Sequence, residues 1–233
     1  MKKFIKKNKF AYKLFLVTRE KLRIVYNVKT RSRFFWNLNN GDNSLSLDYP
    51  LDSKSVVFDI GAYEGNFTKK IYKKFKCNIY AFEPLEKYSE KLKKTFQNDL
   101  NVRIYNFGLL DEDKVIKLSN IDGASSIFSR PEGELNISVT MKSFVKFIEE
   151  NSINKIDFLY MNIEGSEYKL LSQIIESGFI SNINHLQVQF HNFVEGSKKL
   201  RKEIRKELRK THKCKFNYPF IWERWDKLEV ENL

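Results

Sequence analysis

Cysteine is scarce in this 233-residue chain, and long hydrophobic runs are missing from it altogether. The two cysteines, Cys77 and Cys214, are too few for a disulfide framework and lack the C-x-x-C spacing of redox and zinc motifs. No stretch approaches the ~18 consecutive apolar residues that a membrane span needs. The apolar run at 14–17 lies between basic residues and is too short for a signal peptide. These absences predict a cytoplasmic protein that folds without disulfides.

Acidic residues are almost absent from the N-terminal part of the chain. Residues 1–40 contain twelve lysines and arginines but one acid, Glu20, in a chain whose net charge is +13. A second basic run, 198–215, holds ten lysines and arginines against Glu203 and Glu207. Such runs favour an anionic partner, which is a membrane surface, a nucleic acid or a phosphorylated substrate. A solvated lysine-rich face is the alternative interpretation.

Residues 1–45 form a basic N-terminal extension in this interpretation, and 46–233 form the main domain. The extension has rough helical periodicity in its apolar residues, which predicts one or two helices packed on the domain. Contact of residues 1–40 with an anionic membrane is a further interpretation, because basic amphipathic helices bind such surfaces. The turn-forming cluster 39–43 ends the extension.

Strand and helix patterns alternate from residue 51 onward. Alternation of this kind predicts a mostly parallel sheet with helices on both faces, and ligands that bind beyond the carboxyl ends of the strands. The predicted main strands are 56–60, 78–82, 102–107, 156–162 and 185–190, with short strands at 115–118 and 137–140 and a closing hairpin at 216–229. The predicted helices are 66–76, 86–96, 142–150, 167–177 and 197–212.

Two motifs at the ends of the first two strands predict a cofactor site. The first strand runs into D-I-G-A-Y-E-G at 59–65, and the second ends in A-F-E-P at 81–84. Glycine allows the backbone to approach a ligand closely, and an acid that ends the second strand can bind ribose hydroxyls. A dinucleotide site favours G-x-G-x-x-G, whereas this chain has only Gly61 and Gly65. The spacing therefore favours an adenosyl ligand with an amino-acid group and a sulfonium, with a plain strand-to-helix turn as the alternative.

Each residue of these motifs has an expected part in holding the ligand. Glu83 is expected on the ribose and Asp59 on the amino group. A further set is expected to border the cofactor, with the last three flanking its adenine: Tyr63, Pro84, Asn106, Phe107 and Gly108.

These motifs, together with I-D-F-L-Y-M-N-I-E-G-S-E at 156–167 and L-Q-V-Q-F-H at 186–191, resemble the FkbM family of S-adenosylmethionine-dependent methyltransferases. The resemblance covers about residues 50–195. It implies a Rossmann-like class I methyltransferase fold, with a seven-stranded sheet whose last strand is antiparallel, and S-adenosyl-L-methionine as methyl donor. It also implies methylation of hydroxyls, often on sugars of natural products or bacterial surface glycans. One departure is Asn162, where the family usually has Asp.

Polar residues beyond the fourth and fifth strands are the candidates for chemistry. A sugar hydroxyl must lose its proton during methyl transfer, so a base or a metal ion is expected. We expect His191 to act as general base, with Glu164 to orient it and Asn162 beside the acceptor. Glu167 is a candidate for substrate binding, with a helix-start acid as the alternative.

Further site residues and a metal follow less directly from the pattern. Ser125 and Ser126 lie in a loop expected to cover the acceptor. A metal such as Mg²⁺ is not favoured here; if one binds, Glu164, Glu167 and His191 are the ligands expected.

The sequence thus predicts an O-methyltransferase that acts on a hydroxyl of a sugar, nucleotide sugar or surface glycan in bacterial capsule or other polysaccharide biosynthesis. The cytoplasm, at most beside the inner face of the membrane, is the expected location. One alternative is an RNA methyltransferase, which is disfavoured because the chain lacks an Asn/Asp-Pro-Pro-Tyr motif and a Pro-Cys nucleophile. The other alternative is a non-catalytic cofactor-binding protein. The acceptor and the oligomeric state stay open at this point.

Overall fold

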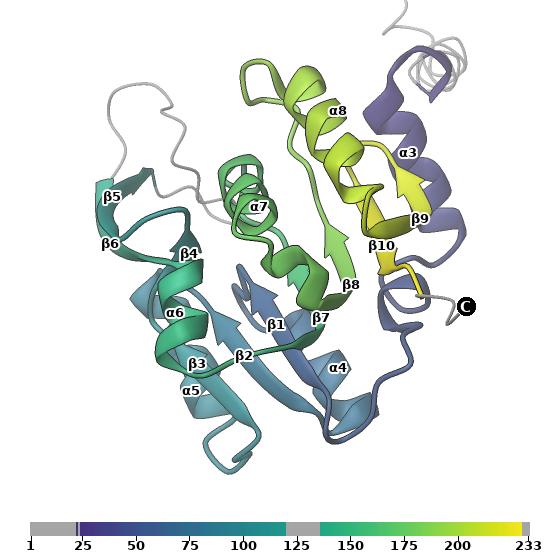
Figure 1. Cartoon of the computed structure of the whole chain (residues 1–233). Helices are drawn as coiled ribbons and strands as arrows, with labels where there is room; N and C mark the ends of the chain where they lie inside the picture. Colours follow the sequence, from purple (N-terminus) through teal and green to yellow (C-terminus); the bar gives the residue numbers. More distant parts are fainter. Residues whose placement is uncertain (1–21, 23, 120–135, 230–233) are drawn as a thin grey trace, which may run out of the picture.

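A seven-stranded sheet organises the protein in the computed structural model, which describes residue 22 and residues 24–119 and 136–229 (Figure 1). Its strand order is β3-β2-β1-β7-β8-β10-β9. All neighbours from β3 to β8 pair in parallel, while β10 runs antiparallel to both β8 and β9. The predicted mostly parallel sheet with an antiparallel last strand is therefore confirmed. Its strands are β1 (Val56–Ile60), β2 (Asn78–Phe82), β3 (Val102–Tyr105), β7 (Ile156–Met161), β8 (Ile183–Val188), β9 (His212–Tyr218) and β10 (Trp222–Lys227).

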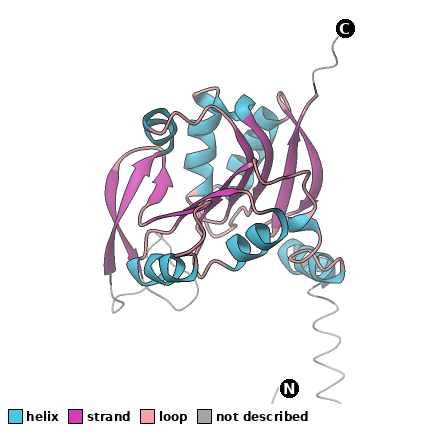
Figure 2. Ribbon diagram, turned by 90° about the horizontal axis from the view of Figure 1, so that it is seen from below, coloured by secondary structure: helices cyan, strands magenta, loops and turns pink. Residues whose placement is uncertain are grey.

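Helices cover both faces of this sheet, as Figure 2 shows. On β7, Phe158 and Tyr160 face one layer, and Leu159 and Met161 face the other. The central strands are therefore apolar on both sides, as parallel strands between two helical layers must be. The first layer comprises α3 (Val28–Leu38), α4 (Asn66–Phe75) and α5 (Glu86–Thr95), and the second comprises α6 (Phe144–Glu150), α7 (Glu167–Glu176) and α8 (Ser197–Leu208).

A second, three-stranded sheet was only partly foreseen. Its order is β4-β6-β5, from β4 (Gly108–Leu110), β5 (Lys114–Ser119) and β6 (Asn136–Ser143). The prediction missed β4, because three residues are too short to show alternation. It also began the following helix at 142, whereas β6 continues to Ser143 and α6 begins at Phe144.

The described part of the N-terminal extension is packed on the sheet. Trp36 of α3 is fully buried against Ile221 and Trp222, and its indole nitrogen donates to Asp42 Oδ1 at 2.9 Å. A side chain at Gly41 would collide with the Trp36 ring, so the turn closes directly over the indole. Helix α3 is thus integrated with the domain, in line with the prediction of a packed helix, and residues 1–21 lie outside the described part.

The basic run on α8 serves the fold in part. Arg201 Nε donates to Glu223 Oε1 at 2.5 Å, and Arg205 pairs with the other carboxylate oxygen of Glu223. Glu223 is only 1% exposed on β10, so both arginines neutralise a buried charge. No helix within the described ranges is long and apolar enough to cross a bilayer.

The burial of Trp36 leads to a test of how α3 is held. We expect Trp36→Ala to lower the free energy of unfolding by about 3 kcal/mol, because it empties a packed site under α3. Leu38→Ala on the same helix is the matched control, since Leu38 is 69% exposed. Urea denaturation that gives equal midpoints for the two variants would contradict the packing described here.

Candidate active site

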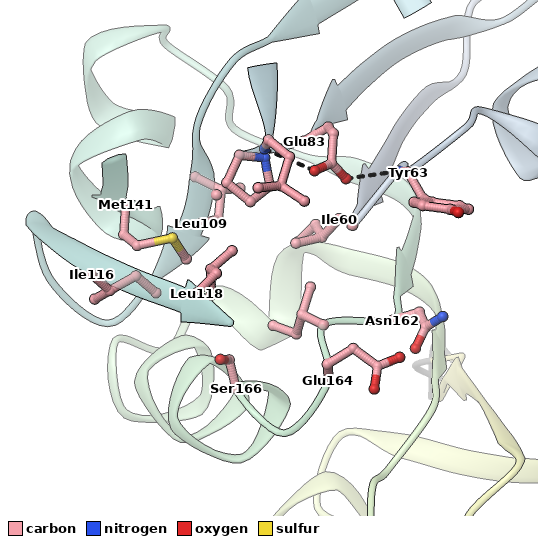
Figure 3. Close-up of a pocket in the computed structure, with 15 residues that line it drawn as sticks. Ile60, Tyr63, Glu83, Leu109, Ile116, Leu118, Met141, Asn162, Glu164 and Ser166 are labelled. Atoms are coloured by element: carbon pink, nitrogen blue, oxygen red, sulfur yellow. Dashed lines mark hydrogen bonds between the residues drawn. The ribbon is translucent and has the colours of Figure 1, made fainter. Parts of the chain in front are cut away.

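Loops that follow β1, β2 and β7 enclose a cavity at the carboxyl edge of the main sheet (Figure 3). The empty space within it, counted together with space open to solvent, is about 810 Å³. The small sheet closes one side of it. The lining residues are Ile60, Gly61, Tyr63, Glu83, Pro84, Leu85, Gly108, Leu109, Ile116, Leu118, Met141, Asn162, Ile163, Glu164 and Ser166.

The turn after β1 is pressed against the end of β7. Gly61 has φ +87°, and a Cβ on it would lie 2.1 Å from the backbone oxygen of Asn162. The N–H groups of Gly61 and Ala62 both donate to Phe82 O at 3.0 Å. Only glycine fits this close approach, which brings the ends of β1, β2 and β7 to one place.

Glu83 lies at the end of β2 with its carboxylate between two backbone donors. Oε2 accepts from Tyr63 N at 2.8 Å and Oε1 accepts from Leu85 N at 2.9 Å, as Figure 3 shows. Burial raises the pKa of Glu83, while these two N–H groups oppose the rise. Each carboxylate oxygen keeps a lone pair for a ligand hydroxyl.

Asp59 lies behind this turn and does not line the cavity. Its Oδ2 accepts from Thr68 Oγ1 at 2.5 Å, while its buried Oδ1 has no hydrogen-bond partner within the described part of the chain. Burial raises the pKa of Asp59 to about 7, the Thr68 hydroxyl opposes the rise, and the charge of Glu83 adds to it. A cationic group bound nearby would lower this pKa again.

The structure sorts the remaining residues expected around the cofactor into two groups. Tyr63, Pro84 and Gly108 line the cavity. Gly65 does not line it; this residue caps α4 with φ +75°, and a Cβ there would collide with Leu92.

Only one of the three residues expected to flank adenine lines the cavity. Asn106 is exposed away from the cavity, and Phe107 packs on Phe82, Tyr105 and Phe147. The reason is that the chain passes from β3 straight into β4, so that only Gly108 of the three faces the cavity.

An apolar wall from the small sheet was missed at the sequence level. Ile116 and Leu118 of β5 and Met141 of β6 line the cavity, while Val115 and Lys117 point outward. This period-2 alternation was a readable signal of a half-buried strand. The sequence did not show which core the strand would cover.

Two acceptor groups form the polar end of the cavity, opposite Glu83 in Figure 3. The side-chain oxygen of Asn162 is buried and has no hydrogen-bond partner in the parts described. Glu164, with φ +48°, has a side chain that is 26% exposed and lies 3.5 Å from His191 Nε2. Left-handed backbone at a non-glycine residue is strained and is common at functional sites.

His191 is held by the first turn of α7. Glu167 Oε1 accepts from the backbone N–H of His191 at 2.7 Å and lies 3.2 Å from its ring Nδ1. Tyr168 OH donates to the His191 carbonyl at 2.7 Å. Glu167 Oε2 accepts from Gly165 N at 2.7 Å, so this carboxylate joins the loops after β7 and β8.

This arrangement bears on the expected role of His191 as general base, which stays a prediction. Burial lowers the pKa of His191, but hydrogen bonds and charges from Glu164 and Glu167 outweigh it and raise the pKa to about 9. A pKa raised in this way favours the protonated imidazole at neutral pH, and that form does not accept a proton. Glu164, which faces the cavity, is the better-placed proton acceptor.

The expectations for Glu167 and for a metal also change. Glu167 is fully buried, and both of its oxygens accept backbone N–H groups, so it is not available to a substrate. No three acidic, histidine or cysteine side chains in the described ranges are arranged to hold a metal ion. The set Glu164, Glu167 and His191 forms an ion-pair chain instead. Ser125 and Ser126 lie outside the described residues.

Asp59 near the end of β1, Glu83 just beyond β2 and the glycine turn between them form the arrangement expected for a nucleoside ligand. The methyltransferase FkbM domain matches residues 59–218, so the chain belongs to the FkbM methyltransferase family. It is an S-adenosylmethionine-dependent methyltransferase. No curated protein matches the chain by sequence.

Solved structures agree on the fold. One similar structure is SMU.1697c from Streptococcus mutans, assigned as a methyltransferase, in complex with SAH. It has 15% identity and a TM-score of 0.51 over 82% of this chain and 97% of that one. Another is a protein from Clostridium thermocellum assigned as an rRNA-methylase, with 12% identity and a TM-score of 0.51 over 82% and 96%. At these identities the likeness shows the Rossmann-like methyltransferase fold.

The donors and acceptors of the cavity fit S-adenosylmethionine. That molecule presents an ammonium group and ribose hydroxyls as donors. The cavity offers the Glu83 carboxylate and the side chain of Asn162, and Asp59 Oδ1 is a further acceptor without a partner in the described residues, buried behind the turn. The apolar wall suits a flat base.

The raised pKa of His191 leads to a test by pH. Because its folded-state pKa of about 9 exceeds the ordinary 6.5, its contribution to stability is complete below pH 6.5. The contribution is lost as pH rises through about 9. We expect the free energy of unfolding to fall between about pH 6 and about pH 10 in the wild type, and to fall less in His191→Gln. Identical pH profiles from urea denaturation would contradict the charged histidine.

Proposed function

We propose that the protein transfers a methyl group to a hydroxyl of a sugar, nucleotide sugar or surface glycan. The observation that carries this proposal is the polar end of the cavity, where the Asn162 side-chain oxygen and the Glu164 carboxylate are both acceptors. Hydroxyl groups are the donors that such a pair binds best. The family supports the same reaction class.

The cofactor assignments follow from the cavity. S-adenosylmethionine, when bound, supplies an electrophilic methyl group on a positively charged sulfur. We assign Glu83 to its ribose hydroxyls, Asp59 to its ammonium group, and the wall of Ile116, Leu118 and Met141 to its adenine. The unpartnered Asp59 Oδ1 and the carboxylate of Glu83 beside the cavity support these roles.

Glu164 takes the acceptor proton in this proposal, and His191 is a positioning residue. The protonated His191 ring lies 3.5 Å from Glu164 and 3.2 Å from Glu167, so it directs the Glu164 carboxylate while Glu167 fixes the ring. Asn162 accepts from the same or a neighbouring hydroxyl. No step requires a metal ion at these residues.

The cellular setting rests on the family and on charge. We place the reaction in the cytoplasm, in the synthesis of a capsule or another polysaccharide. Contact of residues 1–40 with an anionic membrane stays a prediction. The exposed Phe34, Phe35 and Leu38 on α3, beside Arg33, are compatible with it.

An RNA acceptor is the second candidate, favoured by the basic runs and by a fold similar to that of the assigned rRNA-methylase. A flipped base is normally stacked between aromatic or apolar side chains. The apolar wall is assigned here to the adenine of the methyl donor, and among the described residues that line the cavity Tyr63 alone is aromatic. The sugar hydroxyl is therefore the better-supported acceptor.

A mass-spectrometric screen tests the choice of acceptor. Purified protein and S-adenosylmethionine are incubated with nucleotide sugars, free sugars, lipid-linked sugars or single-stranded RNA, each with and without Mg²⁺. We expect a gain of one methyl group on a sugar. Methylation of RNA alone would replace the sugar proposal, and no transfer to any hydroxyl acceptor would remove it.

The ribose assignment is tested at Glu83. We expect Glu83→Ala to weaken S-adenosylmethionine binding by about 1–3 kcal/mol, because charged hydrogen bonds are lost. Glu86→Ala, three residues later and exposed, is the control. Calorimetry gives the affinity, and thermal unfolding of both variants separates binding from folding. Equal affinities in two folded variants would refute the assignment.

The proton acceptor is tested at Glu164. We expect Glu164→Gln to reduce kcat ~10²-fold or more while the affinity for S-adenosylmethionine is unchanged. Glu195→Gln, an exposed acid in the loop that follows β8, is the control. His191→Ala should cause a similar loss through mispositioned Glu164. Wild-type turnover in Glu164→Gln would exclude it as the base.

A further inference from the structure

A basic hollow lies beside the candidate active site, between α3 and the loop that follows β8. Its lining consists of Asn27, Lys29, Thr30, Arg33 and Asn192. Because Asn192 of that loop shares the hollow with residues of α3, the beginning of α3 lies beside the loop. The hollow therefore lies next to the loop that carries His191.

No residue that the structure describes neutralises the charge of this hollow. Lys29 and Arg33 are four residues apart on α3, and neither has a hydrogen bond or ion pair from its side chain in the described part of the chain. Arg201 and Arg205 have the same spacing on α8, but there the buried Glu223 binds both. Two cations without a carboxylate face a hollow in the first case, whereas the second pair supports the fold.

Polar donors complete the hollow. Asn27 Oδ1 accepts from Thr30 N at 2.9 Å, which leaves the amide nitrogen of Asn27 to donate outward. Asn192 is exposed and adds a second amide. Arginine binds phosphate through two parallel N–H groups and lysine binds it as a point charge, so this set suits a phosphate or diphosphate.

Two consecutive residues link the hollow to the polar end of the cavity. Asn192 directly follows His191, and consecutive Cα atoms are about 3.8 Å apart. His191 is buried towards Glu164, whereas Asn192 is exposed. Two neighbouring sites of this kind suit two parts of one acceptor, a phosphate at the hollow and a sugar hydroxyl at Glu164.

We propose that this basic hollow binds the phosphate groups of a phosphorylated sugar acceptor, through Lys29 and Arg33. The inference rests on the proposed function and specifies its substrate class. The phosphate belongs either to a nucleoside diphosphate sugar or to a lipid-linked sugar diphosphate, since both present the same group to the hollow.

The experiment compares Lys29→Gln/Arg33→Gln with Lys198→Gln/Lys202→Gln, which removes two exposed cations at the same spacing on α8. We expect the first variant to raise KM for a UDP-sugar or a polyprenyl-diphosphate sugar ~10–100-fold, with kcat unchanged. The control variant should match the wild type. Whichever of the two acceptors is turned over by the wild type identifies the source of the phosphate.

Binding measurements keep this inference separate from the proposed function. Calorimetry with UDP and with inorganic pyrophosphate should show affinity in the wild type and its loss in Lys29→Gln/Arg33→Gln alone. If the wild type methylates no sugar, the proposed function fails, and these titrations still decide whether the hollow binds phosphate.

Three outcomes would overturn the inference while the proposed function stands. The first is an unchanged KM for phosphorylated acceptors, and the second is equal KM for free and phosphorylated sugars in the wild type. The third is a variant whose only defect is weaker binding to single-stranded RNA or to anionic phosphatidylglycerol vesicles. Thermal unfolding of the variant must match the wild type, which we expect because Arg33 is exposed and Lys29 is partly so.

Discussion

The polar half of the site depends on one fully buried carboxylate, that of Glu167. Burial of a carboxylate is costly unless hydrogen bonds replace its water. Here the backbone N–H groups of Gly165 and His191 take the place of water, and the His191 ring forms an ion pair with the carboxylate. Because these donors come from loops after two different strands, satisfying the carboxylate also fixes the loops to each other.

The position of Glu167 explains why an acid begins α7 without serving as a simple helix-start acid. A surface acid at a helix start stabilises the helix by a few tenths of a kcal/mol up to about 1 kcal/mol. This one is removed from solvent and holds a histidine in its charged form, next to the strained backbone of Glu164. The strained backbone of Glu164 and the buried charge of Glu167 each cost free energy of folding, and they lie at the same site. Such costs are expected where function constrains the fold.

The two carboxylates assigned to the cofactor differ in their position and in their hydrogen bonds. Glu83 lines the cavity and receives two backbone donors, whereas Asp59 is sealed behind Gly61 with one oxygen unpartnered. The burial that raises the pKa of Asp59 also leaves an acceptor ready for a cation. The site is therefore polarised, with negative groups near the strand ends and an apolar wall from the small sheet opposite.

The order of strands and helices was readable from periodicity, because each buried strand and each amphipathic helix repeats its pattern locally. Strands 56–60 and 78–82 were placed to the residue, and the turn at Gly61 follows from a local need for glycine. The short β4 carried no periodic signal, and its presence moved Phe107 into the core. The contacts of His191 with Glu164 and Glu167 could not be predicted for a related reason, since a residue type does not reveal which side chains will face it.

The amino-acid sequence by itself determined the parallel sheet, the glycine turn and the acids at the strand ends, because these depend on spacing along the chain. Only the tertiary structure decided which acid faces the cavity, which histidine holds its proton and which basic pair stays unneutralised. Those properties depend on burial and on partners far apart in sequence, such as Glu167 with His191 and Arg201 with Glu223.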